Sequence, residues 1–284
     1  MKFAFIEEHR RAYKTRHLCQ LLGVSRSGFY AWRSRAPSAH RQYDAQLKAV
    51  ITELHQGFRR CYGAPRLHRA LVQRGYRCSR RRVNRLMREL GIQASTVGLY
   101  RWQPGRHAFY SSAGNQLATM PPAQQPGCQW AGDFTYVRTR NGWLYHAIVM
   151  DLFSRQVLGW SFGRKRGTEL TASALKMALA RERPREGCLF HSDQGIEYAA
   201  HEYRDLLRDA GFTRSMSRKG NPLDNAVVES YFHSLKSECV QRKTFKDRIE
   251  AAAKIVAYTE FYNRERLHSS LGYRAPQEYA ELCA

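Results

Sequence analysis

The sequence predicts an α/β protein in which a basic, all-α region precedes a domain built on a mixed β-sheet. Residues 16–91 carry apolar residues at helical spacing, interrupted by glycine turns, whereas residues 128–163 hold short runs rich in β-branched and aromatic residues. Charge divides the chain in the same way. Residues 1–120 contain 23 of the 47 Lys and Arg residues but only 5 of the 24 Asp and Glu residues, a net charge of +18, which leaves +5 for residues 121–284. We therefore expect the helical half to bind a polyanion, for which nucleic acid is the natural candidate.

The overall composition is that of a folded protein. A chain of 284 residues with 43% hydrophobic and 12% aromatic content is expected to form about two domains. No apolar run approaches the roughly 20 residues of a membrane helix, and glutamates interrupt the apolar patch at the start, which argues against a signal peptide. The seven cysteines are scattered without a CxxC pair, a pattern typical of reduced cytosolic thiols that gives no zinc site. These features predict a soluble, intracellular protein.

Residues 1–40 are expected to form a helix-turn-helix-like N-terminal segment. Within them, residues 16–35 fit a helix, a glycine turn and a second helix with a serine N-cap. Apolar side chains would pack between the two helices and leave Arg26 and Arg33 outside. Both arginines are therefore candidate DNA contacts, although helical hairpins of this form also occur in proteins that do not bind DNA.

A second basic helical region, again helix-turn-helix-like, is expected over residues 41–110. A helix at 42–58 is followed at 64–91 by a helix that Pro65 opens, a glycine turn, and a further helix with a serine N-cap. Arginine and asparagine recognise base edges and arginine also binds phosphates, so the polar faces of this last helix predict DNA contact, with phosphate contact expected before base reading. The candidate residues are Arg80, Arg81, Arg82, Asn84, Arg85 and Arg88. Binding to a membrane surface is a weaker alternative, because these segments resemble packed helices rather than one amphipathic anchor.

Residues 111–127 are expected to be a linker, because they lack apolar periodicity and contain three prolines and two glycines. The mixed-sheet domain is placed at 128–284. Three strands separated by short turns predict an antiparallel meander, and the helices and strands that alternate after it predict a mixed sheet. The expected strands are 128–139, 143–152, 155–163, 188–192 and 213–217, and the expected helices are 167–183, 198–210, 223–238 and 247–263.

Three carboxylates are candidate site residues in this domain. Asp133 lies inside the first strand, where aspartate is disfavoured, Asp193 ends the fourth strand, and Glu229 borders the apolar face of the penultimate helix. Asn225 and Lys236 share a polar stripe with Glu229 on that helix. For Glu229 alone, the simpler interpretation is a boundary residue supported by its neighbours. A cluster of acids is stabilised by bound cations, however, and oxygen ligands without a Cys or His set indicate Mg²⁺ or Mn²⁺.

Four motifs, in order along the chain, resemble a known family. The stretches DFTYV, HSDQGIEY, NPLDNAVVESYFHSLKSE and FYNRERLHSSLGYRAPQEY are similar to those of the OrfB proteins of two-frame bacterial insertion sequences, which belong to the insertion-sequence-three family. The thirty-five residues between Asp193 and Glu229 resemble the Asp, Asp-35-Glu signature of retroviral integrases and related transposases. The resemblance runs from about residue 45 to the end of the chain.

The resemblance implies an RNase H-like catalytic fold, with Asp133, Asp193 and Glu229 as the catalytic residues and as ligands of two Mg²⁺ or Mn²⁺ ions. Lys236 matches a basic residue of the family and is expected to contact DNA near the reacting end. The implied activity is that of a transposase, a polynucleotidyl transferase that cleaves the ends of its insertion sequence and joins the 3′ ends to DNA.

The resemblance also implies partners and a location. The implied partners are the terminal repeats of the element, target DNA, further copies of this chain in a homo-oligomer, and the product of an upstream reading frame, either separate or fused to this chain by frameshifting. No membrane is implied. The implied location is the bacterial cytoplasm, in association with the nucleoid.

Several alternatives stay open at the level of sequence. The basic helical half alone would suit a DNA-binding regulator or a catalytically decayed transposase, and a nuclease of RNase H type would need no strand transfer. A tyrosine recombinase is disfavoured because no Arg…His-x-x-Arg…Tyr arrangement is evident. His191 and Gln194 either contact the site or complete the strand end, and residues 262–273 either pack the last helix against the sheet or contact DNA.

Overall fold

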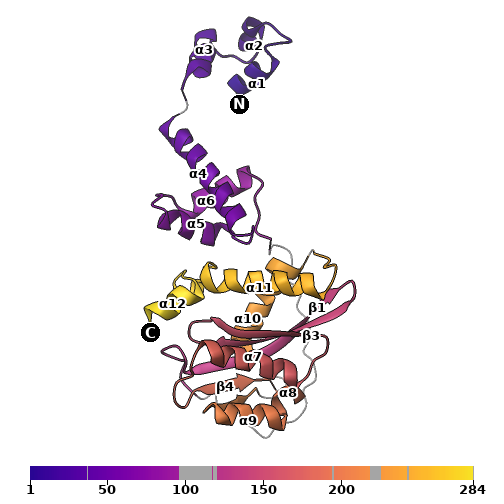
Figure 1. The fold of residues 1–284 in the computed structure, drawn as a ribbon. Coiled ribbons are helices and arrows are strands. Elements are labelled where there is room, and N and C mark those ends of the chain that lie inside the picture. The colour runs from indigo at the N-terminus through magenta and orange to yellow at the C-terminus, as the bar shows by residue number, and fades with distance from the viewer. Residues whose placement is uncertain are drawn as a thin grey trace.

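The computed structural model contains an N-terminal run of helices and a C-terminal domain in which helices cover a β-sheet (Figure 1). The structure describes residues 1–36, 38–95, 117, 120–193, 195–217, 225–241 and 243–283. Within those ranges, no helix is both long and apolar enough to cross a lipid bilayer.

The first three helices surround a small core of their own, whose buried residues are Ile6, Leu18, Cys19 and Phe29. They are α1 (Lys2–His9), α2 (Thr15–Leu21) and α3 (Arg26–Ser34). The turn before α3 places Gly23 at φ 60°, and the side chain of Ser25 accepts a hydrogen bond from the Gly28 amide at 3.0 Å. The helix pair expected at 16–35 is therefore present. Helix α1 has no counterpart among the expected helices, because only one of its eight residues is buried and no apolar periodicity reveals it.

Helices α4 (Ala39–Gly57), α5 (Ala64–Gln73) and α6 (Arg80–Glu89) form a second unit with a larger core. Helix α4 begins before the expected position because Ser38 caps it, accepting a hydrogen bond from the Arg41 amide at 3.3 Å. The main buried residues of the unit are Leu47, Ile51, Leu54, Tyr62, Leu67, Leu71, Val83, Leu86, Met87 and Leu267. Because Leu267 belongs to the C-terminal part of the chain, this unit packs directly against the sheet domain.

The sheet has five strands in the order β3-β2-β1-β4-β5. The strands are β1 (Gln129–Thr139), β2 (Gly142–Asp151), β3 (Val157–Gly163), β4 (Leu189–Ser192) and β5 (Thr213–Met216). Strands β1, β2 and β3 pair antiparallel, whereas β4 pairs parallel with both β1 and β5. The expected meander and the expected mixed sheet are both confirmed.

Helices cover both faces of this sheet (Figure 1). They are α7 (Thr168–Arg181), α8 (Ile196–Ala199), α9 (His201–Asp209), α10 (Ala226–Leu235) and α11 (Arg248–Arg264). A π-helical turn η2 (Lys236–Val240) follows α10, and a 3-10 turn η3 (Ser269–Leu271) and helix α12 (Pro276–Leu282) follow α11. The single helix expected at 198–210 is two short helices. The helix expected at 223–238 changes to π geometry after Leu235, and its first two residues lie outside the described ranges.

Strand β1 divides the core into two layers. Ala131 and Val137 pack on the face covered by α10 and α11, whereas Trp130 packs on the face covered by α7 and α9. Asp133 shares the alternation of Ala131 and Val137, so it belongs to the α10 side of the sheet. On the other face, a Cβ atom at Gly159 would lie 2.2 Å from the Ala174 carbonyl oxygen, so the close approach of α7 to β3 requires glycine there.

The last residues of the expected linker lie against the sheet domain. The Gly127 amide donates a hydrogen bond to Asp151 Oδ1 at 3.0 Å, and Gln129 Nε2 donates to the Pro121 carbonyl oxygen at 3.0 Å. Within the expected linker at 111–127, residues 111–116, 118 and 119 lie outside the described ranges, and so do residues 96–110 of the expected second helical region.

Candidate active site

Two of the three expected carboxylates are neighbours in the sheet. The parallel register pairs Gly132 of β1 with Ser192 of β4, so Asp133 and Asp193 follow paired residues on strands that lie about 5 Å apart in a β-sheet. Each carboxylate accepts a local backbone hydrogen bond. Asp133 Oδ1 accepts from the Phe134 amide at 2.7 Å, and Asp193 Oδ1 accepts from the Gly195 amide at 2.9 Å.

The third carboxylate comes from α10, which lies on the same side of the sheet as Asp133. Val228 and Phe232 anchor this helix in the core, and Glu229 stands in its exposed first turn. Burial raises the pKa of Asp133 well above its usual range, and the charges of Asp193 and Glu229 raise it further. The structure therefore places Asp133 within electrostatic range of both Asp193 and Glu229.

The pKa values of the other two carboxylates are raised as well. Burial raises the pKa of Asp193, against the effect of its hydrogen bond from Gly195, and the nearby charge of Glu197 adds to the rise. Glu229 is exposed to solvent on one side, and desolvation by the surrounding protein raises its pKa. Carboxylates whose ionised forms are destabilised in one place are the groups that a bound cation would stabilise most.

The donor set fits a hard cation, but the described side chains do not enclose one. The carboxylates of Asp133, Asp193 and Glu229 offer the oxygen ligands that Mg²⁺ and Mn²⁺ prefer. No group of three or more His, Cys, Asp or Glu side chains among the described residues is close enough to hold a metal ion. Asp133, Asp193 and Glu229 thus interact through their charges without standing at ligand distance from a common point.

Lys236 lies next to this group at the first position of the π-helical turn. Its charge lowers the pKa of Asp133, against the larger effects of burial and of the two acids. Its Nζ atom lies 5.6 Å from the centre of the Tyr136 ring, within the range of a cation–π contact. Asn225, at the N-cap of α10, is buried, and its Oδ1 atom has no hydrogen-bond partner among the described residues. Of the expected polar stripe, Glu229 and Lys236 both act electrostatically on Asp133.

The contacts of His191 favour a structural role for this residue. His191 is fully buried, and its two ring nitrogens lie 2.9 Å from Ser215 Oγ and 3.0 Å from Ser217 Oγ. These contacts join the end of β4 to β5. Gln194, the second residue left open by the sequence, lies outside the described ranges.

Two residues beside Asp193 were not identified from the sequence. Glu197 is buried, lies 3.5 Å from Arg166 Nε and acts on the pKa of Asp193. Tyr198 is buried, its hydroxyl has no hydrogen-bond partner among the described residues, and burial raises its pKa, with further contributions from Tyr203 and Asp133. Both residues lie in the HSDQGIEY motif. The glutamate and tyrosine at the end of that motif could have identified them as neighbours of Asp193.

The candidate DNA-binding residues of α6 divide into two groups. Arg82 Nε and Arg85 Nη2 each donate to a different oxygen of Asp44 on α4, both at 2.7 Å, and Arg85 also pairs with Glu89. These arginines therefore hold α6 against α4. The exposed candidates that make no ion pair or side-chain hydrogen bond with other described residues are Arg80, Arg81, Asn84 and Arg88.

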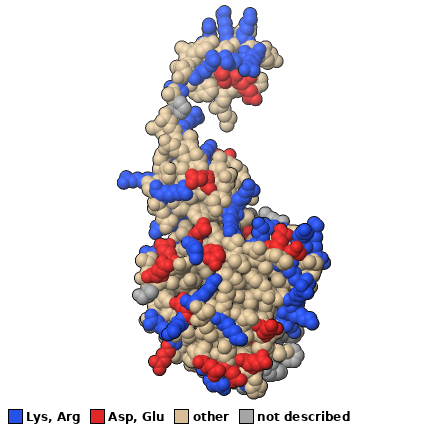
Figure 2. All heavy atoms as spheres, in the orientation of Figure 1, with Lys and Arg blue, Asp and Glu red and all other residues tan. Residues whose placement is uncertain are grey.

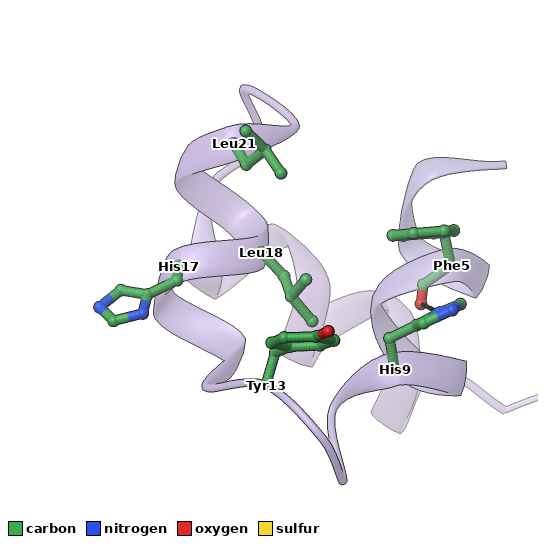
Figure 3. A pocket seen from close by; sticks show the side chains of 6 residues that line it. All are labelled: Phe5, His9, Tyr13, His17, Leu18 and Leu21. Carbon is green, nitrogen blue, oxygen red and sulfur yellow. Dashed lines mark hydrogen bonds between the residues drawn. The ribbon is translucent and has the colours of Figure 1, made fainter.

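The N-terminal candidates are both on α3 and exposed. Arg33 Nε lies 3.5 Å from Glu7 Oε2, whereas Arg26 has no ion pair with the described residues. Figure 2 shows lysine and arginine side chains projecting from these N-terminal helices and gathered along one edge of the sheet domain. An apolar pocket in the same N-terminal segment is separate from the carboxylates (Figure 3). Its lining residues are Phe5, His9, Tyr13, His17, Leu18 and Leu21.

A five-stranded mixed sheet covered by helices on both faces, preceded by a basic helical unit, is the architecture of an integrase core, and family models agree. Models described as integrase core domains match residues 123–222 and 210–276, and a model described as an HTH-like domain matches residues 42–98. These matches confirm the expected RNase H-like fold and the helix-turn-helix character of the α4–α6 unit.

The chain belongs to the IS3 family of transposases. It is 36% identical to the transposase InsF for insertion sequence IS3A of Escherichia coli K12 over 282 residues, which cover 98% of each chain. It is 38% identical over 265 residues to the insertion element IS600 uncharacterized 31 kDa protein of Shigella sonnei, covering 93% of this chain and 97% of that protein.

Solved structures of viral integrases are more distant. A chain of the simian T-cell lymphotropic virus intasome in complex with the PP2A regulatory subunit B56 gamma is 15% identical, with a TM-score of 0.47, over 81% of this chain and 74% of its own. The HTLV-2 integrase catalytic core domain in complex with magnesium is 16% identical, with a TM-score of 0.43, over 55% of this chain and 97% of its own.

Proposed function

We propose that this protein, as the transposase of a bacterial insertion sequence, cleaves the ends of its element and joins their 3′ ends to target DNA. Asp133, Asp193 and Glu229 are the catalytic carboxylates of this reaction. The observation that carries the proposal is the parallel pairing of Gly132 with Ser192, which makes Asp133 and Asp193 neighbours on the side of the sheet where α10 supplies Glu229.

The proposed chemistry uses the carboxylates as ligands. Asp133, Asp193 and Glu229 would hold two Mg²⁺ or Mn²⁺ ions, which when bound activate a water or a DNA 3′-hydroxyl and stabilise the leaving 3′ oxygen. Lys236, beside Asp133, would bind a phosphate of the DNA near the reacting end. No covalent link between protein and DNA is needed, so the buried tyrosines of this domain have no role as nucleophiles.

The proposed partners follow from the two units. The α4–α6 unit would bind the terminal repeats of the element through the exposed side of α6, while the carboxylate site acts on the ends and on target DNA. Joining two ends requires more than one protomer. The chain would act together with, or fused to, the product of an upstream reading frame, in the bacterial cytoplasm at the nucleoid.

A circle-junction assay in cells tests the proposal. The intact element, with the upstream frame fused in frame, would carry either the wild-type chain, Asp133→Asn, or the matched control Asp209→Asn, which changes an exposed aspartate of α9. We expect abutted-end junctions from the wild type and the control but not from Asp133→Asn. Absence of junctions from all three, with folded protein bound to the element ends, would instead support a DNA-binding regulator or a catalytically decayed transposase.

A further inference from the structure

The C-terminal segment after α11 is part of the core of the α4–α6 unit. Leu267 is buried in that core, and its backbone is held on both sides. The Leu267 amide donates a hydrogen bond to Tyr62 Oη at 2.8 Å, and Arg66 Nε donates to the Leu267 carbonyl oxygen at 2.9 Å. Tyr62 Oη in turn donates to the Glu265 carbonyl oxygen at 3.2 Å. The segment is therefore fixed by the helical unit as much as by the sheet domain.

Its neighbour Arg266 binds the helix that carries Glu229. The Arg266 guanidinium donates to both oxygens of Glu238, with Nη2 to Oε1 at 2.7 Å and Nε to Oε2 at 2.9 Å. The same Nη2 atom donates to Ser234 Oγ at 3.2 Å, and Tyr258 Oη donates to Glu238 Oε2 at 2.9 Å. Glu238 lies in η2 and Ser234 lies in α10. The cluster therefore holds the C-terminal end of α10, which carries Glu229 and is called the catalytic helix below.

The cluster is buried and charged. The side chain of Glu238 is 1% exposed and that of Arg266 is 5% exposed. Burial alone would lower the pKa of Arg266, but the hydrogen bonds to Glu238 outweigh it and raise that pKa. A bidentate pair of this kind fixes orientation closely, and the loss of one partner leaves a buried charge without compensation. The position of Glu238 is therefore tied to the position of Arg266.

Arg59, in the turn after α4, joins the two units at the same junction. Arg59 and Arg60, just after α4, adopt positive φ angles of 53° and 61°, which are disfavoured for residues other than glycine. Arg59 Nη2 donates to the Ala257 carbonyl oxygen of α11 at 2.8 Å, and its guanidinium lies 4.9 Å from the Phe261 ring. Such conformations persist where surrounding contacts enforce them, and these contacts cross from the helical unit to the sheet domain.

We propose that residues 265–267 couple the docking of the α4–α6 unit to the placement of the catalytic helix. Leu267 anchors in the helical unit, and the adjacent Arg266 fixes Glu238 two residues beyond Lys236. Arg266 and Glu238 are positioning residues: both side chains are buried, and they set where Glu229 and Lys236 stand. The π-helical turn is the element that responds, because it contains both Lys236 and Glu238 and π geometry is rare. The inference rests on the proposed roles of Glu229 and Lys236.

The test compares Tyr62→Phe with Tyr43→Phe. Tyr62→Phe removes the hydroxyl that binds Glu265 and Leu267 but keeps the ring, which stacks on Phe58 at 4.2 Å. Tyr43 makes the same pair of backbone hydrogen bonds, to the carbonyl oxygen and amide of Arg77 at 3.1 Å and 3.0 Å, entirely within the helical unit. The second change is thus a matched control that leaves the junction intact.

Hydrogen exchange of the full-length protein provides the first readout. We expect exchange of residues 226–241 to become about tenfold faster in Tyr62→Phe, as the loss of a buried hydrogen bond allows, and to stay at the wild-type rate in Tyr43→Phe. The second readout is the rate of cleavage of element ends, with DNA affinity measured in parallel. Tyr62→Phe should slow cleavage while affinity stays within about twofold of the wild type.

A second variant keeps the test decisive. Leu267→Ala removes the anchor from the core of the helical unit and should also speed exchange in residues 226–241. If residues 226–241 exchange at the wild-type rate in both Tyr62→Phe and Leu267→Ala, the proposal is overturned. It is also overturned if Tyr62→Phe and Tyr43→Phe change the exchange rate of residues 226–241 equally. Hydrogen exchange does not depend on activity, so it separates the coupling from the proposed reaction. If the wild type does not cleave element ends but exchange is faster in Tyr62→Phe, the coupling is supported and the proposed reaction is not. If the wild type cleaves but exchange is unchanged in Tyr62→Phe, the reaction is supported and the coupling is not.

Discussion

Arg82 lies against Asp44, with its Nε atom donating to Asp44 Oδ1 at 2.7 Å. This contact distinguishes the arginines of α6 that bind α4 from the basic residues that stay exposed. The same aspartate binds Arg85, and the Arg82 guanidinium also lies 5.0 Å from the centre of the Tyr43 ring. These two arginines thus join α6 to α4, although the sequence places them among the DNA-contact candidates. Arg80, Arg81, Asn84 and Arg88 are left as the exposed polar surface of the helix.

Substitution of Arg81 and of Arg82 should therefore have different effects. We expect Arg81→Ala to weaken DNA binding, and to lower the slope of log affinity against log salt by about 1, as the loss of one proposed phosphate contact would do. Arg82→Ala should lower the thermal stability of the α4–α6 unit, because Asp44 loses a partner. Titrations of terminal-repeat DNA at several salt concentrations, with thermal unfolding of each variant, measure both effects. A salt slope near zero for the wild type would contradict the polyanion-binding role of the basic half.

Acid should remove the stabilisation that Asp44 contributes. Hydrogen bonds from Arg85, together with Arg82 and against the effect of burial, lower the pKa of Asp44 to about 2 from its usual 3.8. A carboxyl group whose pKa is lowered by folding stabilises the folded state above its unfolded pKa, and loses that stabilisation as the pH falls toward the folded value. Asp44→Asn should therefore destabilise the protein at neutral pH.

The measurement is the difference in unfolding free energy between wild type and Asp44→Asn as a function of pH. This difference should be constant above about pH 5 and should shrink between about pH 4 and pH 2. A difference that stayed constant throughout that interval would mean that the charge of Asp44 does not stabilise the fold.

Glu229→Gln should abolish end cleavage and leave DNA binding nearly intact. The substitution keeps the size of the side chain but removes a charge that acts on Asp133. We expect the cleavage rate to fall by roughly three orders of magnitude, as for the loss of other catalytic groups. Glu202→Gln, on the exposed first turn of α9, is the control and should retain activity. Loss of both cleavage and DNA binding in Glu229→Gln would indicate that Glu229 is structural.

Asp133→Asn should distinguish the effect of charge repulsion on stability from the effect of metal binding. Without divalent cations, the variant should unfold at a temperature at least as high as the wild type, because burial and the charges of Asp193 and Glu229 destabilise the ionised Asp133 carboxylate. Mg²⁺ or Mn²⁺ should raise the unfolding temperature of the wild type and not that of the variant. Thermal unfolding with and without each cation tests this, and an equal rise in both proteins would exclude Asp133 as a ligand.

Much of the sheet domain could be predicted from the sequence, because strand patterns are local. The alternation of apolar residues along β1 depends only on a period of two; it predicts that Ala131 and Val137 share a face with Asp133, and both pack on the α10 side, from which Glu229 and Lys236 act on Asp133. The five strands were expected for the same reason. The change to π geometry after Leu235 was not expected, because the apolar spacing of residues 223–238 is that of a continuous helix; in this turn Glu238 pairs with Arg266.

The sequence by itself determined the strand order along the chain, the basic character of the helical half, and the three acids with their spacing. Only the tertiary structure decided which arginines are exposed, and which acids lie near one another. Arg82 meets Asp44 from 38 residues away, and Arg266 meets Glu238 from 28 residues away. The physical reason is range: periodicity reports on neighbours within one or two turns, whereas an ion pair forms only where packing brings two distant segments within hydrogen-bonding distance.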